Sequence, residues 1–340
     1  MIKKTKIAIL GGAGFIGHNL ALELSKNKKY EVLIVDNFKV NNLKSTIHSP
    51  KENKKLLLSI LKNRLSLLKK NKLKIQNLNI KNFILLKKKM KYFKPDYIFH
   101  FAAVSHANIS NIDPKFTFDN SVETLMNTLE IVKVLNCQLM YLSSSMVYGN
   151  FKGKKVNERS KCNPLGIYGN FKYICEKMIK SYNQVFNIKY TIIRPSALYG
   201  ERCVSRRVGQ IFIENALMNK TIKINGNGEE KLDFTYIKDF ISGIKKTINN
   251  KNSINQTFNL TYGSARKIND LLKILKKKFP NLKIEYVNRD KLTPIRGTLS
   301  NLKIRRVLNH RSKFSIDKGY KSYIKWYMDF FKKKKITVEN

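Results

Sequence analysis

Short apolar or mixed runs alternate with helical patterns through the first 195 residues of the chain. The runs that we expect to form strands are Ile7–Leu10, Val32–Val35, Lys74–Gln76, Tyr97–Phe101, Leu139–Leu142 and Tyr190–Ile193. The helical patterns between them include Phe15–Leu24, Phe118–Leu135 and Tyr168–Val185. Strands that alternate with helices predict an α/β fold, in which a doubly wound parallel sheet is covered by helices on both faces.

Beyond Pro195 the pattern becomes less regular, with turn signals at residues 226–228 and at Asn309. We predict that residues 1–195 form one domain, to which a segment around 233–262 returns. Residues 196–232 and 263–340 are then expected to form a smaller C-terminal α/β lobe that binds the substrate. Residues 41–72 are longer than the connection between the second and third strands requires. The leucine-rich stretches 56–61 and 65–68 predict a helix there, and the sequence indicates no function for it.

The charge of the chain is unusually positive. Lysine and arginine number 67 against 23 acidic residues, which gives a formal net charge of +44. Such a charge is typical of proteins that bind nucleic acids or anionic membranes. Here the charge is mostly lysine and is scattered along the whole chain, whereas a binding face concentrates arginine and aromatic residues. We therefore expect a lysine-rich composition without a nucleic-acid or membrane partner.

Export and metal binding are not indicated either. No apolar run approaches the length of a membrane-spanning helix, and no signal peptide precedes the first strand, so a cytoplasmic location is expected. The four cysteines are too widely spaced for a zinc pattern or a disulfide framework, and we expect no metal and four reduced thiols. They are Cys137, Cys162, Cys175 and Cys203.

A glycine-rich turn connects the first strand to the first helix. Glycines recur either as Gly11, Gly14 and Gly17 or as Gly12, Gly14 and Gly17. Missing side chains let a backbone approach a pyrophosphate closely, and the helix N-terminus adds free N–H groups and a positive dipole end. Asp36 ends the second strand, nineteen positions after Gly17, where an acidic residue accepts hydrogen bonds from the adenosine ribose. This arrangement predicts a Rossmann-type domain and favours NAD over NADP.

A second set of residues points to acid–base chemistry. Tyr168 and Lys172 lie four residues apart at the start of a helical pattern, so they share one helical face. A positive charge beside a tyrosine favours its phenolate form, which can then act as a base. The serines 143–145 and the small residues 101–103 follow two predicted strands, at the edge where open α/β sheets bind ligands.

With these motifs the chain resembles the extended short-chain dehydrogenase/reductase family, in its branch of NAD-dependent nucleotide-sugar epimerases and dehydratases. Further matches are the segments 194–200 and 226–239. The resemblance implies that Tyr168 is the general base and acid, that Lys172 holds the nicotinamide ribose, and that Ser144 relays the proton, with Ser145 as the alternative. It implies an NAD site formed by Gly11, Gly14, Phe15, Ile16, Gly17, Asp36, Asn37, Asn79, Ile80, Phe101, Ala102, Ala103, Asn120, Tyr168, Lys172 and Pro195.

The resemblance also implies a substrate site, where the chain departs from the family pattern. The expected residues are Ser105, Ser145, Tyr199, Arg202, Gln210 and Arg296. Ala197 stands where the family often has a polar contact, and Leu232 where it often has a phosphate-binding arginine. Either Arg296 or the pair 206–207 is a candidate for the missing phosphate clamp, with a solvated charge pair as the alternative for 206–207.

The reaction that the resemblance favours is epimerisation. Family dehydratases carry an acidic pair just after the relay residue, but this chain has Ser145 and Met146 there, which disfavours elimination. We expect a 4-epimerase of nucleotide sugars, with a transient keto-sugar and return of the hydride from the bound cofactor. The alternatives are a nucleotide-sugar reductase, dehydrogenase or dehydratase, and outside the family a non-catalytic nucleotide-sensing or nucleic-acid-binding protein. By analogy we expect a homodimer formed through the helices that contain Tyr168 and residues 118–135.

Overall fold

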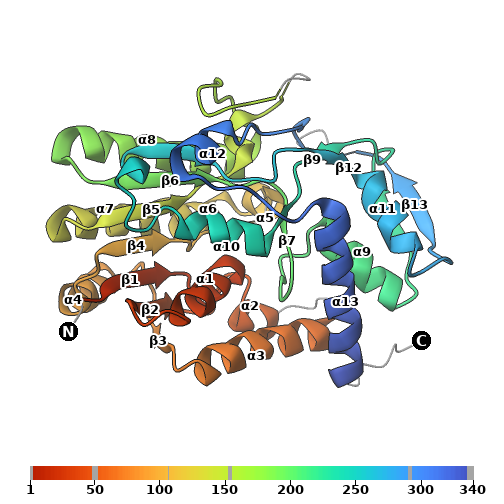
Figure 1. Ribbon diagram of the computed structural model, residues 1–340, viewed down its shortest axis with the longest axis horizontal. Coiled ribbons are helices and arrows are strands. Elements are labelled where there is room, and N and C mark those ends of the chain that lie inside the picture. The colour runs from red at the N-terminus through yellow and green to blue at the C-terminus, as the bar shows by residue number, and fades with distance from the viewer. Residues whose placement is uncertain (1–2, 48–52, 106, 152–154, 290–292, 335–340) are drawn as a thin grey trace.

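The computed structural model describes residues 3–47, 53–105, 107–151, 155–289 and 293–334. A seven-stranded parallel sheet forms its centre, in the order β11-β6-β5-β4-β1-β2-β3 (Figure 1). The strands are β1 (Thr5–Leu10), β2 (Tyr30–Asp36), β3 (Lys74–Asn77), β4 (Tyr97–His100), β5 (Gln138–Leu142), β6 (Tyr190–Arg194) and β11 (Gln256–Asn259). The doubly wound parallel sheet predicted from the apolar runs is therefore confirmed. Its last strand, β11, comes from the segment 233–262 and pairs with β6.

Two layers of helices bury the two faces of the sheet in separate hydrophobic cores. One layer contains α1 (Phe15–Ser25), α3 (Lys54–Lys70) and α10 (Ile237–Lys245), and the other contains α4 (Phe83–Phe93), α7 (Thr124–Leu135) and α8 (Gly166–Phe186). The central strands β1, β4 and β5 are mostly apolar because parallel strands are covered on both faces, whereas the edge strand β3 is largely polar. The helix predicted within residues 41–72 is confirmed as α3, preceded by the short α2 (Leu43–Ile47), while residues 48–52 lie outside the described part.

The helix predicted over Phe118–Leu135 is not regular. It is preceded by α5 (Ala107–Ile112) and α6 (Pro114–Phe118), and a π-helical segment, η1 (Asp119–Glu123), separates α6 from α7. A π-turn adds one residue to a helical turn, a feature that often marks functional sites. Asn120 lies in this segment, and its side-chain amide donates to the carbonyl of Phe116.

A second lobe adjoins the carboxyl ends of the strands, to the right in Figure 1. Three two-stranded pairs link segments that are distant in sequence: β7 (Leu198–Tyr199) with β10 (Thr235–Tyr236), β8 (Ile222–Asn225) with β13 (Ile284–Val287), and β9 (Lys231–Leu232) with β12 (Arg266–Lys267). Its helices are α9 (Val208–Leu217), α11 (Ile268–Lys276) and the long C-terminal α13 (Ile316–Lys334), and α12 (Leu302–Leu308) returns to the sheet beside β11.

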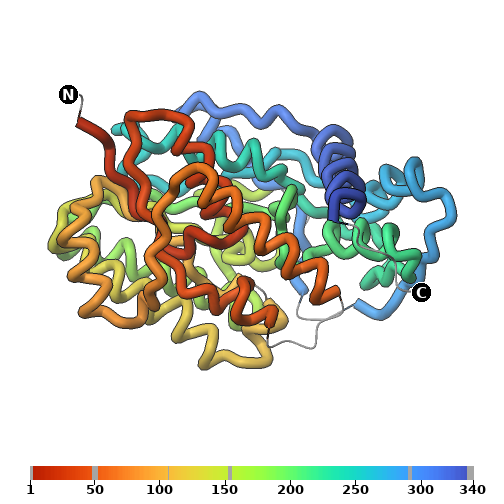
Figure 2. Tube along the Cα trace, turned by 90° about the horizontal axis from the view of Figure 1, so that it is seen from below, coloured from red at the N-terminus to blue at the C-terminus, as the bar shows by residue number. Residues whose placement is uncertain are grey.

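Figure 2 shows the same arrangement from below, with α3 crossing the molecule towards the second lobe. Residues of α3 and α13 belong to the same hydrophobic core, so this helix joins the two lobes. The four cysteines are free thiols, as expected. Within the described residues, no helix is both long and apolar enough to cross a membrane.

Candidate active site

The glycine-rich turn between β1 and α1 borders a cavity of about 560 Å³. Gly11 has a φ of +79°, and a Cβ at this position would lie 2.7 Å from the backbone nitrogen of Ala102. Only glycine allows this turn to lie against the end of β4. Helix α1 begins at Phe15, and the N–H groups of its first turn have no acceptors within the helix. This cradle fits a dinucleotide diphosphate.

Packing decides between the two possible glycine spacings. A Cβ at Gly12 would lie 2.7 Å from the side chain of Ile34, and Gly12 does not line the cavity. The spacing that lines the cavity is therefore Gly11, Gly14 and Gly17.

Asp36 ends β2 on the wall of the same cavity. Its Oδ1 accepts a hydrogen bond from the backbone nitrogen of Phe38, and its Oδ2 accepts one from that of Ala13. Burial raises the pKa of Asp36, and these two bonds oppose the change. Each carboxylate oxygen has a further lone pair, so the group is oriented by the backbone and can still accept bonds from ribose hydroxyls.

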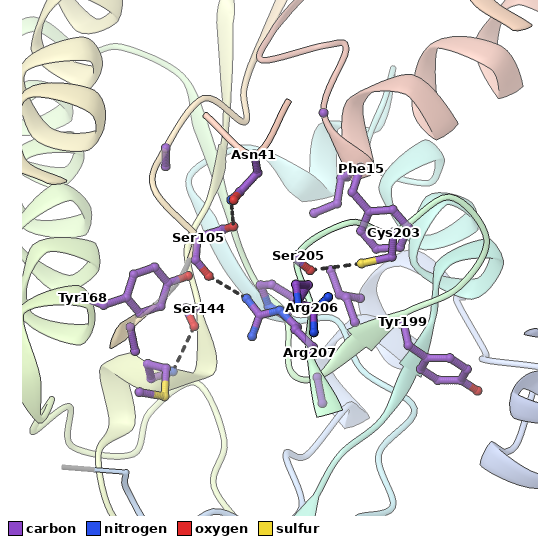
Figure 3. Close-up of a pocket in the computed structure, with 18 of the residues that line it drawn as sticks. Phe15, Asn41, Ser105, Ser144, Tyr168, Tyr199, Cys203, Ser205, Arg206 and Arg207 are labelled. Carbon is purple, nitrogen blue, oxygen red and sulfur yellow. Dashed lines mark hydrogen bonds between the residues drawn. The ribbon is translucent and has the colours of Figure 1, made fainter. Parts of the chain in front are cut away.

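The three predicted catalytic residues meet at the carboxyl ends of β5 and β6. Tyr168 lies in the first turn of α8, and Lys172 follows one turn later; both side chains are buried. The Lys172 ammonium donates a 2.8 Å bond to the carbonyl of Leu142, the last residue of β5. Ser144 caps the 3-10 helix η2 (Ser145–Tyr148), and its Oγ accepts a bond from the nitrogen of Met146. Figure 3 shows Tyr168 and Ser144 directed into the same part of the pocket.

Two features hold α8 against the serine segment. A Cβ on Gly169 would lie 3.0 Å from the carbonyl oxygen of Met146, so a small residue is needed beside Tyr168. Below it, the buried Arg194 forms a 2.6 Å ion pair with Glu176 of α8, and Glu176 also accepts a bond from the hydroxyl of Ser143. The ion pair connects β6, α8 and the residue preceding Ser144. It therefore positions the predicted catalytic residues without lining the cavity.

The structure brings nearly all the predicted site residues together. Every residue expected at the cofactor lines the cavity, as does Ser144. The expected substrate residues that line it are Ser105, Ser145, Tyr199, Gln210 and Arg296.

Two substrate predictions disagree with the side-chain positions. Arg202 does not line the cavity; its Nε donates to Nε2 of His18 on α1. Tyr199 borders the cavity, but its ring packs among Phe234, Tyr236 and Tyr320, and Figure 3 shows it turned away from the pocket centre. Contacts with α1 determine the direction of the Arg202 side chain, and packing against α13 determines that of Tyr199. These contacts join distant segments, so the local sequence does not predict them.

Several arginines converge at the end of the cavity formed by the second lobe. Arg207 donates a 2.7 Å bond to the carbonyl of Ser105 (Figure 3), while Nε of Arg296 is buried without a partner. Burial, and then the charges of Arg207 and Arg289, lower the pKa of Arg296 to about 10. Arg206 differs from its neighbour, because it pairs with the buried Glu214 at 3.4 Å. The pair 206–207 is thus not a simple solvated charge pair.

Sequence reasoning missed two arginines that line the cavity, Arg64 of α3 and Arg289. Arg289 lies 3.7 Å from Glu230, and nothing near it in the sequence marks it as a ligand-binding residue. Arg64 could have been noticed in the sequence, because it interrupts the apolar face of its helix, which is formed by Leu57, Leu61 and Leu68.

A buried histidine behind Lys172 gives the site a pH-dependent stability. Burial, and then the charge of Lys172, lower the pKa of His100 to about 3. Between about pH 6.5 and pH 3 the unfolded state therefore binds a proton that the folded state excludes, and stability falls as pH falls. We expect this residue to contribute up to about 1.4 kcal/mol per pH unit to the free energy of unfolding. Chemical denaturation across this range should show a smaller slope for His100→Gln; equal slopes would contradict the assignment.

The chain matches the family described as the NAD dependent epimerase/dehydratase family over residues 7–261. A Bacillus subtilis protein described as an uncharacterised UDP-glucose epimerase is 32% identical over 266 residues, covering 75% of this chain and 76% of that protein. A Methanocaldococcus jannaschii protein, provisionally named as a UDP-glucose 4-epimerase, is 30% identical over 275 residues, covering 79% and 81%. UDP-glucuronic acid 4-epimerase from Bacillus cereus, solved with UDP-glucuronic acid and NAD, shares the fold with a TM-score of 0.86 at 24% identity, covering 96% of this chain and 99% of that one.

The family match spans well over half of the chain, including the glycine turn and the residues from Ser144 to Lys172. It confirms the family expected from the motifs and the use of NAD. The protein is an enzyme that belongs to the NAD dependent epimerase/dehydratase family.

Proposed function

We propose that the protein is a nucleotide-sugar 4-epimerase that retains NAD through the catalytic cycle. The proposal rests on the set of residues that line one continuous cavity. The cavity contains a dinucleotide cradle at one end, Tyr168, Lys172 and Ser144 in the middle, and at the other end Arg207 and Arg296, which have no carboxylate partner among the described residues. A dinucleotide and a second anionic nucleotide can thus meet at the tyrosine.

The chemistry of the chain's own residues suits a reversible proton transfer. Tyr168 takes the proton from the C4 hydroxyl of the sugar and returns it at the end, and Ser144 relays it between tyrosine and substrate. The ammonium of Lys172 is held by the carbonyl of Leu142, one helical turn after the phenol. NAD⁺ bound here supplies a reversible hydride acceptor. Ser145 and Met146 follow the relay residue, so no carboxylate stands there to eliminate water.

Epimerisation also requires the keto-sugar to present its other face while its nucleotide stays bound. We propose that Arg207 and Arg296 hold the diphosphate of the substrate during this rotation. The charge of the exposed Arg207 opposes that of Arg296, whose Nε is buried, and a diphosphate between them would relieve this repulsion. The lowered pKa of Arg296 agrees with such a site. Leu232, which replaces the family's usual arginine, lines the cavity with an apolar side chain.

Replacing Arg296 with leucine should weaken substrate binding more than catalysis. A hydrogen bond to a charged group contributes about 1.5–3 kcal/mol, so we expect KM for the nucleotide sugar to rise by about 10- to 100-fold. The exposed Arg305 of α12 supplies the matched control, since Arg305→Leu removes the same charge away from the cavity. Steady-state kinetics of both variants measure the effect; an unchanged KM in Arg296→Leu would refute the role.

We also propose that the enzyme is a homodimer formed through α7 and α8. Both helices expose large apolar side chains: Met126 and Val134 on α7, and Ile174, Val185 and Phe186 on α8. A second copy of the same surface would cover them, as a two-fold axis requires. Light scattering during size exclusion should give twice the chain mass of 39.6 kDa.

The proposed activity is tested with a panel of nucleotide sugars and no added cofactor. UDP-glucose, UDP-glucuronate and UDP-N-acetylglucosamine are each incubated with the purified protein, and the products are separated by anion exchange. A 4-epimer formed from at least one of them supports the proposal. Formation of product only when stoichiometric NAD or NADH is added would instead indicate a reductase or dehydrogenase.

A further inference from the structure

The extra helix α3 places one charged side chain inside the protein. Arg64 is 1% exposed and lines the main cavity, on the helical face that also buries Leu57, Leu61 and Leu68. Figures 1 and 2 show α3 lying beneath α1 and reaching towards α13. The insertion thus brings a guanidinium to the wall of the NAD site.

Hydrogen bonds satisfy only one side of this guanidinium. Nε and Nη2 of Arg64 both donate to the backbone carbonyl of Arg202, at 2.8 and 2.5 Å, while Nη1 is buried without a partner. Among the described residues, no carboxylate lies within ion-pair distance of Arg64. A buried charge without a counter-charge is costly, so an anion from outside the chain is the missing partner.

The surroundings of Arg64 add to this positive charge. Arg202 is also largely buried, and its Nε donates to Nε2 of His18 in α1, whose Nδ1 donates to the carbonyl of Gly14. Burial, and then the charges of Arg64 and Arg202, lower the pKa of His18 and keep it neutral. Two guanidiniums therefore lie near the first turn of α1, the positive end of the helix dipole. The nearby acid, Asp36, already accepts two backbone bonds.

We propose that Arg64 is a cofactor-binding residue whose buried positive charge balances the diphosphate of NAD. The first turn of α1 receives a diphosphate through its N–H groups, and Arg64 supplies a full charge from the α3 side of the same cavity, in a region of low dielectric. The proposal rests on the use of NAD and not on the identity of the sugar or the reaction. A protein that reduces sugars instead of epimerising them would need Arg64 equally.

Two substitutions separate charge from packing. Arg64→Gln keeps an amide that can donate to the carbonyl of Arg202 but removes the charge, whereas Arg64→Lys keeps the charge. The full-length proteins, freed of nucleotide, are titrated calorimetrically with ADP and with adenosine. ADP contains the diphosphate, and adenosine reports only on the ribose and adenine contacts.

A role of the Arg64 charge predicts different effects on the affinities for ADP and for adenosine. Arg64→Gln should bind ADP about tenfold more weakly than the wild type, with adenosine affinity changed less than about threefold, and Arg64→Lys should keep most of the ADP affinity. If Arg64→Gln lost affinity for ADP and adenosine equally, or for neither, the proposal would be wrong. Arg64 would then only connect α3 to the backbone at Arg202. If Arg64→Gln does not fold, a tenfold loss of ADP affinity in Arg64→Lys would equally overturn the proposal.

Discussion

Replacing Tyr168 with phenylalanine should reduce turnover of the nucleotide sugar by at least about 100-fold, the usual contribution of a general acid–base residue. The substitution removes one hydroxyl from a buried ring in the first turn of α8 and leaves its packing in place. NAD should therefore remain bound, because the glycine turn, Asp36 and Lys172 are untouched.

The measurement combines kcat with the NAD content of the purified protein. Ser144→Ala is the companion variant, since it removes the relay but leaves the phenol, and we expect it to lose less activity than Tyr168→Phe. Near-normal turnover in Tyr168→Phe would remove this tyrosine from the mechanism. Loss of NAD together with turnover would show that the variant had damaged the cofactor site.

Replacing Arg194 with methionine should destabilise the protein by about 3–5 kcal/mol, the usual effect of leaving a buried charge unpaired. The ion pair between Arg194 and Glu176 joins β6 to α8, and the exposed fractions of the two side chains are 3% and 0%. Arg194 also donates to the hydroxyl of Tyr148, so the substitution removes two hydrogen bonds to Glu176 and one to Tyr148. Urea denaturation measures the change in the free energy of unfolding.

The double variant Arg194→Met with Glu176→Leu is the control. It removes both charges and replaces them with apolar groups of similar size, so it should recover much of the lost stability. A double variant as unstable as Arg194→Met alone would mean that packing, and not the unpaired carboxylate, accounts for the loss.

The sheet was predictable from the sequence, and so was the grouping of the expected cofactor residues around one cavity, because local rules determine both. Buried parallel strands read as continuous apolar runs, and all six predicted strands are present in the sheet. The turn at residues 11–17 and the pair Tyr168 and Lys172 each lie within a single helix or turn. Their geometry relative to one another then follows from the order of the strands.

The substrate end was less predictable because irregular backbone and distant segments build it. Positive φ values occur at Ala197, Arg202 and Arg206. Such backbone angles are uncommon for residues other than glycine, so they cannot be predicted from these residue types. The direction of Arg202 depends on α1, and that of Tyr199 on α13, more than a hundred residues away. The three small strand pairs of the second lobe likewise join segments that no local pattern relates.

The insertion at residues 41–72 illustrates the same limit. Its helix followed from leucine spacing, but the consequence of Arg64 on the apolar face depends on which cavity that face meets. A single arginine among leucines at core spacing indicates a buried charge without a local partner. Only the fold shows that this charge lines the same cavity as the glycine-rich turn.

The most direct test of the proposed function follows the hydrogen on C4 of the sugar. The enzyme is incubated in D₂O with UDP-glucose and with UDP-glucuronate, without added nucleotide, and the products are analysed by NMR and mass spectrometry. We expect a 4-epimer whose C4 hydrogen comes from the substrate, with no deuterium at that carbon. Deuterium at C4, or product only with stoichiometric added cofactor, would contradict it.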